Sequence, residues 1–243
     1  MSLAAVILAA GKGVRMESDL PKVFHKVLGK PLLQYVIETV QKLSPETICI
    51  VVGYKKEDIQ EYFKDYPVKF AKQDEQLGTG HAVLQAQPCL KDFKGEILVL
   101  NGDMPLIKEA TLKNLVDFHR KHKSSATVLT AKVDEPGAFG RVIRNKEGRI
   151  EKIVEKKDAT PAELKINEVN TGTFCFNAEQ LFKALQKVTP ENAQKEYYIT
   201  DTIALLKSEG QPVFAYQTGD EREAIGVNTK DELKSLEQDM ARG

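Results

Sequence analysis

A basic, glycine-rich segment follows the first apolar run of the chain. The run Leu3–Leu8 is succeeded by Ala9-Ala-Gly-Lys-Gly-Val-Arg15, and Lys22 follows after a short interval. Glycine backbone N–H groups can come close to an anion, and the two cations can neutralise its charge. This chemistry suits a polyphosphate and indicates an enzyme that handles nucleotides, although a glycine turn after a strand can also be a plain connection.

The spacing of the glycines excludes two well-known phosphate-binding loops. A P-loop needs Gly-Lys-Ser or Gly-Lys-Thr shortly after its first glycine, and the residues after Gly11 do not supply it. The dinucleotide-binding fingerprint needs a third glycine where this chain has Met16. The segment therefore belongs to neither class.

Asp103 is the strongest acidic candidate for chemistry. It follows the apolar run Ile97–Leu100 within the sequence Asn101-Gly-Asp-Met-Pro105, so we expect it at the carboxyl end of a buried strand. A carboxylate in that position can hold Mg²⁺, which prefers oxygen ligands and retains several waters. The alternative is that Asp103 caps the turn into the next helix.

A second polar, glycine-bearing loop runs from Gln73 to His81. Gln73 carries both hydrogen-bond donors and acceptors, as recognition of a base edge requires. Thr79 could instead cap the helix that follows, and this alternative is compatible with a binding role.

Several polar residues beside predicted elements of the second half could hold sugar hydroxyls, although each alone is more often a cap or turn residue. They are Glu155, Asn170, Thr171, Gly172 and Thr200. His119 and His122 lie three residues apart on a predicted helix, and no third metal ligand is near them in the sequence. We therefore expect exposed surface histidines rather than a metal site.

The first half of the chain alternates between strand-like and helical patterns. The expected strands are Leu3–Leu8, Thr47–Val52, Val68–Ala71 and Ile97–Leu100. The expected helices are Pro31–Leu43, Lys56–Phe63, Gly80–Leu90 and Ile107–His122. This alternation predicts an α/β fold with a doubly wound, mostly parallel, Rossmann-like sheet that binds ligands at the carboxyl ends of its strands.

The second half is richer in turns. The expected strands are Ala126–Val133, Arg141–Ile143, Ile150–Val154, Val169–Phe176 and Pro212–Tyr216. The expected helices are Ala178–Val188, Tyr197–Glu209 and Lys230–Met240. We interpret this half as a smaller mixed β lobe that folds over the active-site edge of the sheet.

The composition bounds the class of protein. The 243 residues are 42% apolar and carry 35 basic and 35 acidic residues, so the formal net charge is zero. Such a balance argues against a role on nucleic acid or on a membrane surface. The cysteines Cys49, Cys89 and Cys175 are far apart, and we expect buried free thiols in a reducing cytoplasm rather than disulfides or a zinc site.

Taken together, the motifs resemble those of the sugar-phosphate nucleotidyltransferases. The opening motif is LAAGKGVRM followed by LPKVFHKVLGKPLL, and the later blocks are QLGTGHA (76–82), NGDMPL (101–106), FGRVI (139–143), IVEKKDAT (153–160), INEVNTG (166–172), NAQKEYYITD (192–201) and GVN (226–228). In collinear order over nearly the whole chain, they are similar to the uridylyltransferase domain of bacterial bifunctional N-acetylglucosamine-1-phosphate uridyltransferases.

The resemblance implies transfer of a uridylyl group from UTP to N-acetylglucosamine 1-phosphate, with Mg²⁺ as cofactor. It implies that the nucleotide is held by Leu8, Ala9, Ala10, Gly11, Lys22, Gln73, Gly78 and Thr79. It implies that Arg15 and Lys22 are catalytic, that Asp103 and Asn228 bind the metal, and that the sugar is held by Gly140, Glu155, Asn170 and Thr200. Where members commonly have Tyr before Gly-Asp, this chain has Asn101.

The resemblance also sets the expected organisation. We expect a nucleotidyltransferase domain over residues 1–228, with a nucleotide-binding half (1–123) and a sugar-binding half (124–228), then a helix over 229–243. The family's left-handed β-helix with acetyltransferase activity is not expected, so the chain is either a stand-alone uridylyltransferase or part of a longer protein. We expect a cytoplasmic monomer or weak dimer that acts on small molecules.

The expected mechanism is in-line attack by a sugar-phosphate oxygen on the α-phosphorus of UTP. The attacking phosphate is already anionic, so no general base is needed, and cations must offset the repulsion between the two substrates. Two alternatives stay open: a nucleotidyltransferase for another sugar 1-phosphate or another base, and a non-catalytic sensor of nucleotide sugars on the same fold.

Overall fold

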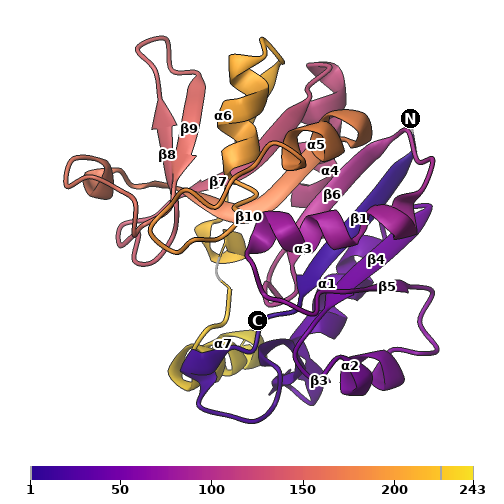
Figure 1. Ribbon diagram of the computed structural model, residues 1–243. Helices are drawn as coiled ribbons and strands as arrows, with labels where there is room; N and C mark the ends of the chain where they lie inside the picture. The colour runs from indigo at the N-terminus through magenta and orange to yellow at the C-terminus, as the bar shows by residue number, and fades with distance from the viewer. Residues whose placement is uncertain (1, 225, 243) are drawn as a thin grey trace.

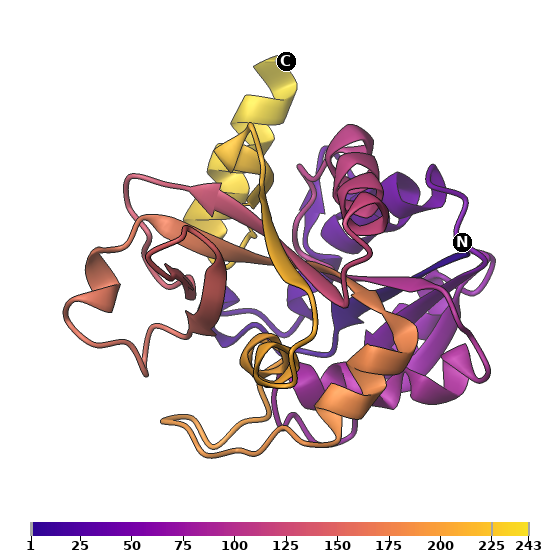
Figure 2. The ribbon, with the colours of Figure 1, turned by 90° about the horizontal axis from the view of Figure 1, so that it is seen from above.

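A run of small and branched apolar residues begins the chain and forms the centre of the sheet. The computed structural model describes residues 2–224 and 226–242. In β1 (Leu3–Ala9), alternate side chains point to opposite faces: Ala4 and Val6 join one hydrophobic cluster, and Ala5 and Ile7 join another. A strand buried on both faces requires helices on both sides of the sheet, and this is the arrangement in Figures 1 and 2.

The parallel part of the sheet comes from the first half of the chain. Its strands are β1 (Leu3–Ala9), β4 (Thr47–Val52), β5 (Lys69–Lys72) and β6 (Glu96–Asn101). β1 lies between β4 and β6 and is parallel to both, and β5 is parallel to β4. The loops that follow β1, β4 and β6 therefore meet at one edge of the sheet, at the switch point where α/β proteins bind ligands.

The second half extends the same sheet. Its strands are β7 (Ala126–Lys132), β8 (Arg141–Arg144), β9 (Ile150–Val154), β10 (Glu168–Asn177) and β11 (Val213–Gln217). In the described part of the chain the order is β11-β7-β10-β6-β1-β4-β5, and β8 and β9 branch from β10. The predicted α/β fold with a mostly parallel sheet is confirmed, and β10, which runs antiparallel between β6 and β7, joins the second half to it.

Helices cover the two faces of the sheet. One face carries α3 (Thr79–Gln85), α5 (Ala178–Leu185) and α6 (Asp201–Ser208), and the other carries α1 (Leu32–Gln41), α2 (Lys56–Tyr62) and α4 (Glu109–Lys121). The short 3₁₀ turns are η1 (Val14–Met16), η2 (Lys22–Phe24), η3 (Gln87–Leu90), η4 (Glu163–Lys165) and η5 (Glu221–Ala224). In the described residues no helix combines the length and apolarity needed to cross a membrane.

A small ribbon and the last helix pack together at one end of the molecule. The ribbon of β2 (Lys26–Val27) and β3 (Lys30–Pro31) is too short to show alternation, so no sequence pattern predicts it. The helix α7 (Lys230–Arg242) lies near β3 (Figure 1), and its Leu236 packs in one cluster with Val27 and Leu32.

His119 contradicts the prediction of an exposed surface histidine. It is 2% exposed, and its Nδ1 lies 2.9 Å from the Thr127 hydroxyl. Because Leu112, Leu115 and Val116 form the buried stripe of α4, helical spacing carries residue 119 onto the same stripe. Burial lowers the pKa of His119 to about 4.

Candidate active site

The glycine-rich segment leaves β1 between its two parallel neighbours. The Leu8 carbonyl accepts a hydrogen bond from the N–H of Gly102 after β6 (2.9 Å), and the Ala10 carbonyl accepts one from the N–H of Tyr54 after β4 (3.1 Å). An added Cβ on Gly11 would meet no heavy atom within 4 Å, so open space lies over this residue. The predicted nucleotide-binding residues Leu8, Ala9, Ala10 and Gly11 thus span the fixed end of β1 and an open turn.

Gly13 folds this loop back so that its two cations come together. It has a φ of +69°, and an added Cβ would lie 2.5 Å from the Cβ of Lys22. A side chain at position 13 would therefore be strained and would also clash. The short turns η1 and η2 carry Arg15 and Lys22, and the fully buried Met16 anchors the loop between them.

Four residues predicted from three distant segments meet at this edge of the sheet. The Nη2 of Arg15 donates to Oδ1 of Asn228 (2.9 Å), and the Nζ of Lys22 donates to the same oxygen (3.1 Å). Lys22 also forms an ion pair with Asp103, which is only 6% exposed. One ammonium therefore bridges the carboxylate of Asp103 and the amide oxygen of Asn228, which are the two expected metal ligands.

The oxygen ligands available at Asp103 and Asn228 suit a hard cation. These two oxygens already hold the positive charge of the Lys22 ammonium between them. Over the described residues, no group of three or more His, Cys, Asp or Glu side chains could hold a metal ion. A metal at Asp103 and Asn228 would thus take few protein ligands and leave positions for water or phosphate, as Mg²⁺ tolerates.

The loop before α3 connects the two halves of the chain. Gln73 is buried, and its Nε2 donates to the Gly78 carbonyl (3.1 Å) and lies 3.0 Å from Nδ1 of His81. The Thr79 hydroxyl accepts the N–H of Ile199 (3.1 Å) and does not cap α3, so the capping alternative is wrong. These contacts place the predicted base-binding loop against the segment that leads into α6.

The predicted sugar-binding residues also converge, although they come from four separate segments. Thr200 donates its hydroxyl proton to Oε1 of Glu155 (3.1 Å). An added Cβ on Gly140 would lie 3.4 Å from both carboxylate oxygens of Glu155, and the Gly140 carbonyl accepts the N–H of Asn170 (2.9 Å). The Oδ1 of Asn170 accepts the N–H of Gly172 (2.9 Å), which fixes that amide.

The electrostatic environment of Glu155 is acidic. Burial raises the pKa of Glu155, and the hydrogen bond from Thr200 opposes this effect. Nearby carboxylates raise it further, namely those of Asp201, Asp158 and Glu196. Burial, together with the charge of Asp158, raises the pKa of Asp201 to about 6. This end of the site favours hydroxyl and amide donors over phosphate oxygens.

Comparison with protein families identifies the class. The sequence pattern of a family described as nucleotidyl transferase matches residues 4–223. The chain belongs to the nucleotidyl transferase family. Enzymes of this family generally use a divalent metal ion and act on small-molecule substrates.

Individual relatives of this nucleotidyl transferase agree with the match. The chain is 48% identical over 242 residues to the bifunctional protein GlmU of Streptococcus gordonii and also to that of Streptococcus sanguinis, covering 100% of this chain and 52% of each relative. The chain thus spans about half the length of these relatives. A crystal structure of UDP-glucose pyrophosphorylase complexed with UDP-glucose has a TM-score of 0.82 at 21% identity, covers 100% of this chain and 99% of that one, and shares the fold.

Sequence reasoning missed the motif that orients Asn228. The Glu232 carboxylate accepts the N–H groups of Asn228 (2.6 Å) and Thr229 (3.2 Å), and the Thr229 hydroxyl accepts the N–H of Glu232 (3.2 Å). This capping box is readable as Thr-x-x-Glu before a helical pattern. The Nδ2 of Asn228 donates to the Gly226 carbonyl (2.8 Å), which turns Oδ1 toward the two cations.

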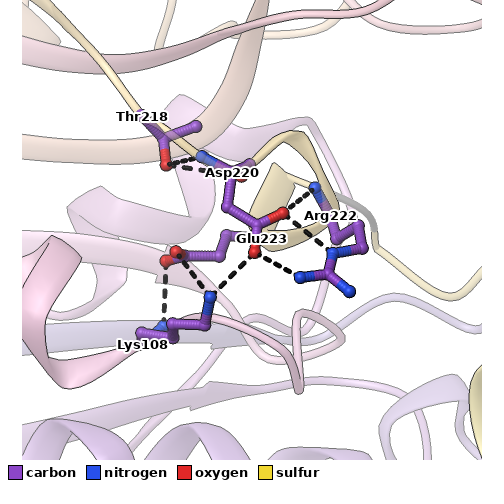
Figure 3. A network of polar contacts seen from close by, with 5 residues as sticks. All are labelled: Lys108, Thr218, Asp220, Arg222 and Glu223. Atoms are coloured by element: carbon purple, nitrogen blue, oxygen red, sulfur yellow. Dashed lines mark hydrogen bonds and ion pairs between the residues drawn. The ribbon is translucent and has the colours of Figure 1, made fainter. Parts of the chain in front are cut away.

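A second missed feature ties the segment before α7 to the start of α4 (Figure 3). The Nζ of Lys108 lies 2.8 Å from Oδ2 of Asp220 and 3.5 Å from Oε1 of Glu223. The backbone N–H of Lys108 donates to Oε2 of Glu223 (3.1 Å). Hydrogen bonds from Arg222 and Lys108 hold the pKa of Asp220 well below its usual range. Glu223 is only 3% exposed, and the sequence does not indicate which charges pair with it.

Asn101, where the chain departs from the family pattern, lies at the junction of the two halves. An added Cβ on Gly172 would lie 2.2 Å from Nδ2 of Asn101, and Gly172 has a φ of +80°. Glycine is therefore required at position 172 for the Asn101 side chain to lie against the backbone of β10.

Proposed function

We propose that this nucleotidyl transferase transfers a uridylyl group from UTP to N-acetylglucosamine 1-phosphate, forming UDP-N-acetylglucosamine and pyrophosphate. The observation that carries the proposal is the contact of Arg15, Lys22, Asp103 and Asn228 at the switch point of the sheet. The 48% identity to GlmU over the whole chain supports this choice of substrates.

The cationic cluster suits the chemistry of the transfer. A bond forms between a sugar-phosphate oxygen and the α-phosphorus, and the bond from that phosphorus to the pyrophosphate oxygen breaks, so no proton has to move. The main barrier is the approach of two anions and the charge that grows on the leaving group. Arg15 and Lys22, which meet at Asn228, would bind and orient the phosphates and offset both charges.

Asp103 and Asn228 would hold Mg²⁺, which would supply further positive charge to the phosphates. Lys22 contacts the same two oxygens. Lys22 would therefore exchange these oxygens for a phosphate oxygen when the metal site is filled. Its side chain has the length and freedom for such a move, since the ammonium is a point charge on a flexible stem.

The polar cluster of Gly140, Glu155, Asn170 and Thr200 would hold the amino sugar. A buried carboxylate accepts hydrogen bonds from hydroxyl or amide groups, and fixed polar groups of this kind orient a ligand. Gln73, Gly78 and Thr79 would hold the uracil and ribose. The proposal includes a nucleotide-binding half over residues 1–123, a sugar-binding half over residues 124–228 and a helix over residues 229–243. The protein would act in the cytoplasm as a monomer or weak dimer.

A matrix of substrates tests the proposal. Pyrophosphate release is measured for four nucleoside triphosphates against the 1-phosphates of N-acetylglucosamine, N-acetylgalactosamine and glucose, with Mg²⁺ and with EDTA. We expect the fastest release with UTP and N-acetylglucosamine 1-phosphate, and only with Mg²⁺. Binding of the nucleotide sugar without turnover in any combination would favour a sensor instead.

A further inference from the structure

Arg141 is a buried cation to which the proposed reaction gives no role. It begins β8, directly after Gly140, and is 3% exposed. In the described part of the chain, no carboxylate lies within ion-pair distance of its guanidinium. By contrast, Arg144 on the same strand pairs with Glu168, with its Nη2 2.6 Å from Oε1 and its Nε 2.7 Å from Oε2.

The guanidinium of Arg141 fills the inside of a turn. Its Nη1 donates to the carbonyls of Phe139 and Pro136 (3.4 Å to the latter), and its Nη2 donates to the Gly137 carbonyl (3.4 Å). The N–H of Phe139 closes the turn onto the Pro136 carbonyl (3.1 Å), and Gly137 has a φ of +48°. Three of the four carbonyl oxygens of residues 136–139 therefore point at one side chain.

A buried charge without a counter-ion is costly, and only the hydrogen bonds to it reduce that cost. Here those bonds come from the turn alone, because the Nε of Arg141 is buried without a partner in the described residues. The guanidinium and the turn therefore support each other: the side chain fills the turn, and the carbonyls of the turn accept its hydrogen bonds. An apolar side chain at position 141 would remove the buried charge but would also remove these donors, so the position of the turn depends on the guanidinium.

The turn leads directly into the predicted sugar site. Gly140 follows Phe139, and its carbonyl accepts the N–H of Asn170 (2.9 Å). The absent side chain of Gly140 leaves its backbone against the carboxylate of Glu155. A shift of the turn would therefore move the backbone that faces the sugar.

We propose that Arg141 is a positioning residue for the sugar end of the site: by holding the carbonyls of Pro136, Gly137 and Phe139, it fixes Gly140 and so sets the affinity for the sugar phosphate without touching it. This inference depends on the proposed function, since it assumes that a sugar phosphate lies beside Gly140 and Glu155.

Steady-state kinetics of R141M and R141K test the inference, with R144M as the matched control on the same strand. We expect R141M to raise the KM for N-acetylglucosamine 1-phosphate by about tenfold or more, because small displacements of substrate-facing groups are costly, with the KM for UTP within about twofold of wild type. R141K should lie between wild type and R141M, since it keeps the charge but not the fork of donors. R144M should lower Tm without separating the two KM values.

Hydrogen exchange provides a readout that does not depend on turnover. The Phe139 amide should exchange faster in both Arg141 variants than in R144M, because its bond to Pro136 lies inside the turn. If R141M does not fold, the same measurements are made on R141K. An unchanged KM for N-acetylglucosamine 1-phosphate in the Arg141 variants, or an equal rise of this KM in R144M, overturns the inference. E155Q separates this failure from failure of the proposed function, because an unchanged sugar KM in E155Q would show that the sugar site itself is misplaced.

Discussion

The two ends of the candidate site balance charge in opposite ways. At the end proposed to bind phosphate, the cations Arg15 and Lys22 reach oxygens of Asp103 and Asn228 that lie far away in the sequence. At the end proposed to bind the sugar, the Glu155 carboxylate receives a hydrogen bond from the neutral hydroxyl of Thr200 and lies near other carboxylates.

This difference gives the site a direction. A substrate with phosphates at one end and hydroxyl and amide groups at the other has one favourable orientation, because the acidic end repels phosphate and the cationic end attracts it. Positive charge would therefore orient the substrate at the phosphate end, and shape and neutral donors would orient it at the sugar end. Substitutions at each end, and at the contact between Gly78 and Tyr197 that joins the two halves of the chain, test this direction.

The largest effects are expected at the phosphate end. Removal of one preorganised charge commonly costs about 10²–10³ in rate, so kcat should fall by at least that order in R15A, K22A and D103N. Single-turnover pyrophosphate release measures this, with Tm as the test of folding. K64A, which removes an exposed lysine that pairs with Glu61, is the control. Near-wild-type turnover in all three variants would refute the cationic cluster as the reaction site.

The contact between the two ends should be the next most sensitive position. Gly78 has a φ of +109°, and an added Cβ would lie 2.7 Å from the Tyr197 carbonyl. Strain and overpacking together should lower the free energy of unfolding of G78A by about 3 kcal/mol. The control is G210A, where φ is +72° but no heavy atom lies within 4 Å of the added Cβ, so only about 1 kcal/mol is expected.

Chemical denaturation of both glycine variants measures this difference. Equal losses in G78A and G210A would mean that backbone conformation alone matters and that the packing of Gly78 on Tyr197 contributes nothing. A rise in the KM for UTP confined to G78A would further support the placement of the base-binding loop.

At the sugar end the effect should fall on one substrate only. E155Q keeps the shape of the side chain but weakens the hydrogen bonds that it accepts, which is worth roughly 1–2 kcal/mol for a buried charged acceptor. The KM for the sugar phosphate should rise by about tenfold while that for UTP stays constant. E151Q, which changes an exposed carboxylate on β9, the strand that ends directly before Glu155, is the control. Equal changes in both KM values would remove the distinction between the two ends.

The smallest effect concerns the stability of the acidic end. Asp201 has a pKa of about 6 against an ordinary value of 3.8, so between these values the folded state binds a proton that the unfolded chain has released. Its contribution therefore favours folding more as pH falls from about 6 to about 4, and it opposes folding above pH 6.

D201N removes this titration. At pH 7 it should raise the free energy of unfolding by about 1 kcal/mol, after allowance for solvent screening and for the lost favourable charge in the first turn of α6. For a chain of this size that is a rise in Tm of about 2–4 °C. Thermal unfolding from pH 4 to pH 8 measures it, and a D201N curve parallel to that of wild type would contradict the perturbed pKa.

Much of the fold could be predicted because it depends on local patterns. The buried runs that became β1, β4 and β6, and the helical spacing of Leu32, Leu33, Val36, Ile37 and Val40 in α1, are set by periodicity within a few residues. The ribbon β2–β3 was missed because two-residue strands carry no period. The polar type of His119 predicts exposure, but its position on the buried stripe of α4 decides its environment.

The candidate site also contains features that follow from local sequence patterns and features that depend on tertiary contacts. The sequence by itself determined a glycine-rich basic loop after β1, an aspartate after β6 and membership of the family, because these depend on residue types at short spacing. Only the tertiary structure decided that Lys22 bridges Asp103 and Asn228, which lies 206 residues from it, and that the hydroxyl of Thr79 meets Ile199. Such pairings depend on which strands become neighbours in the sheet, and no local pattern encodes the partner of a side chain that lies across the fold.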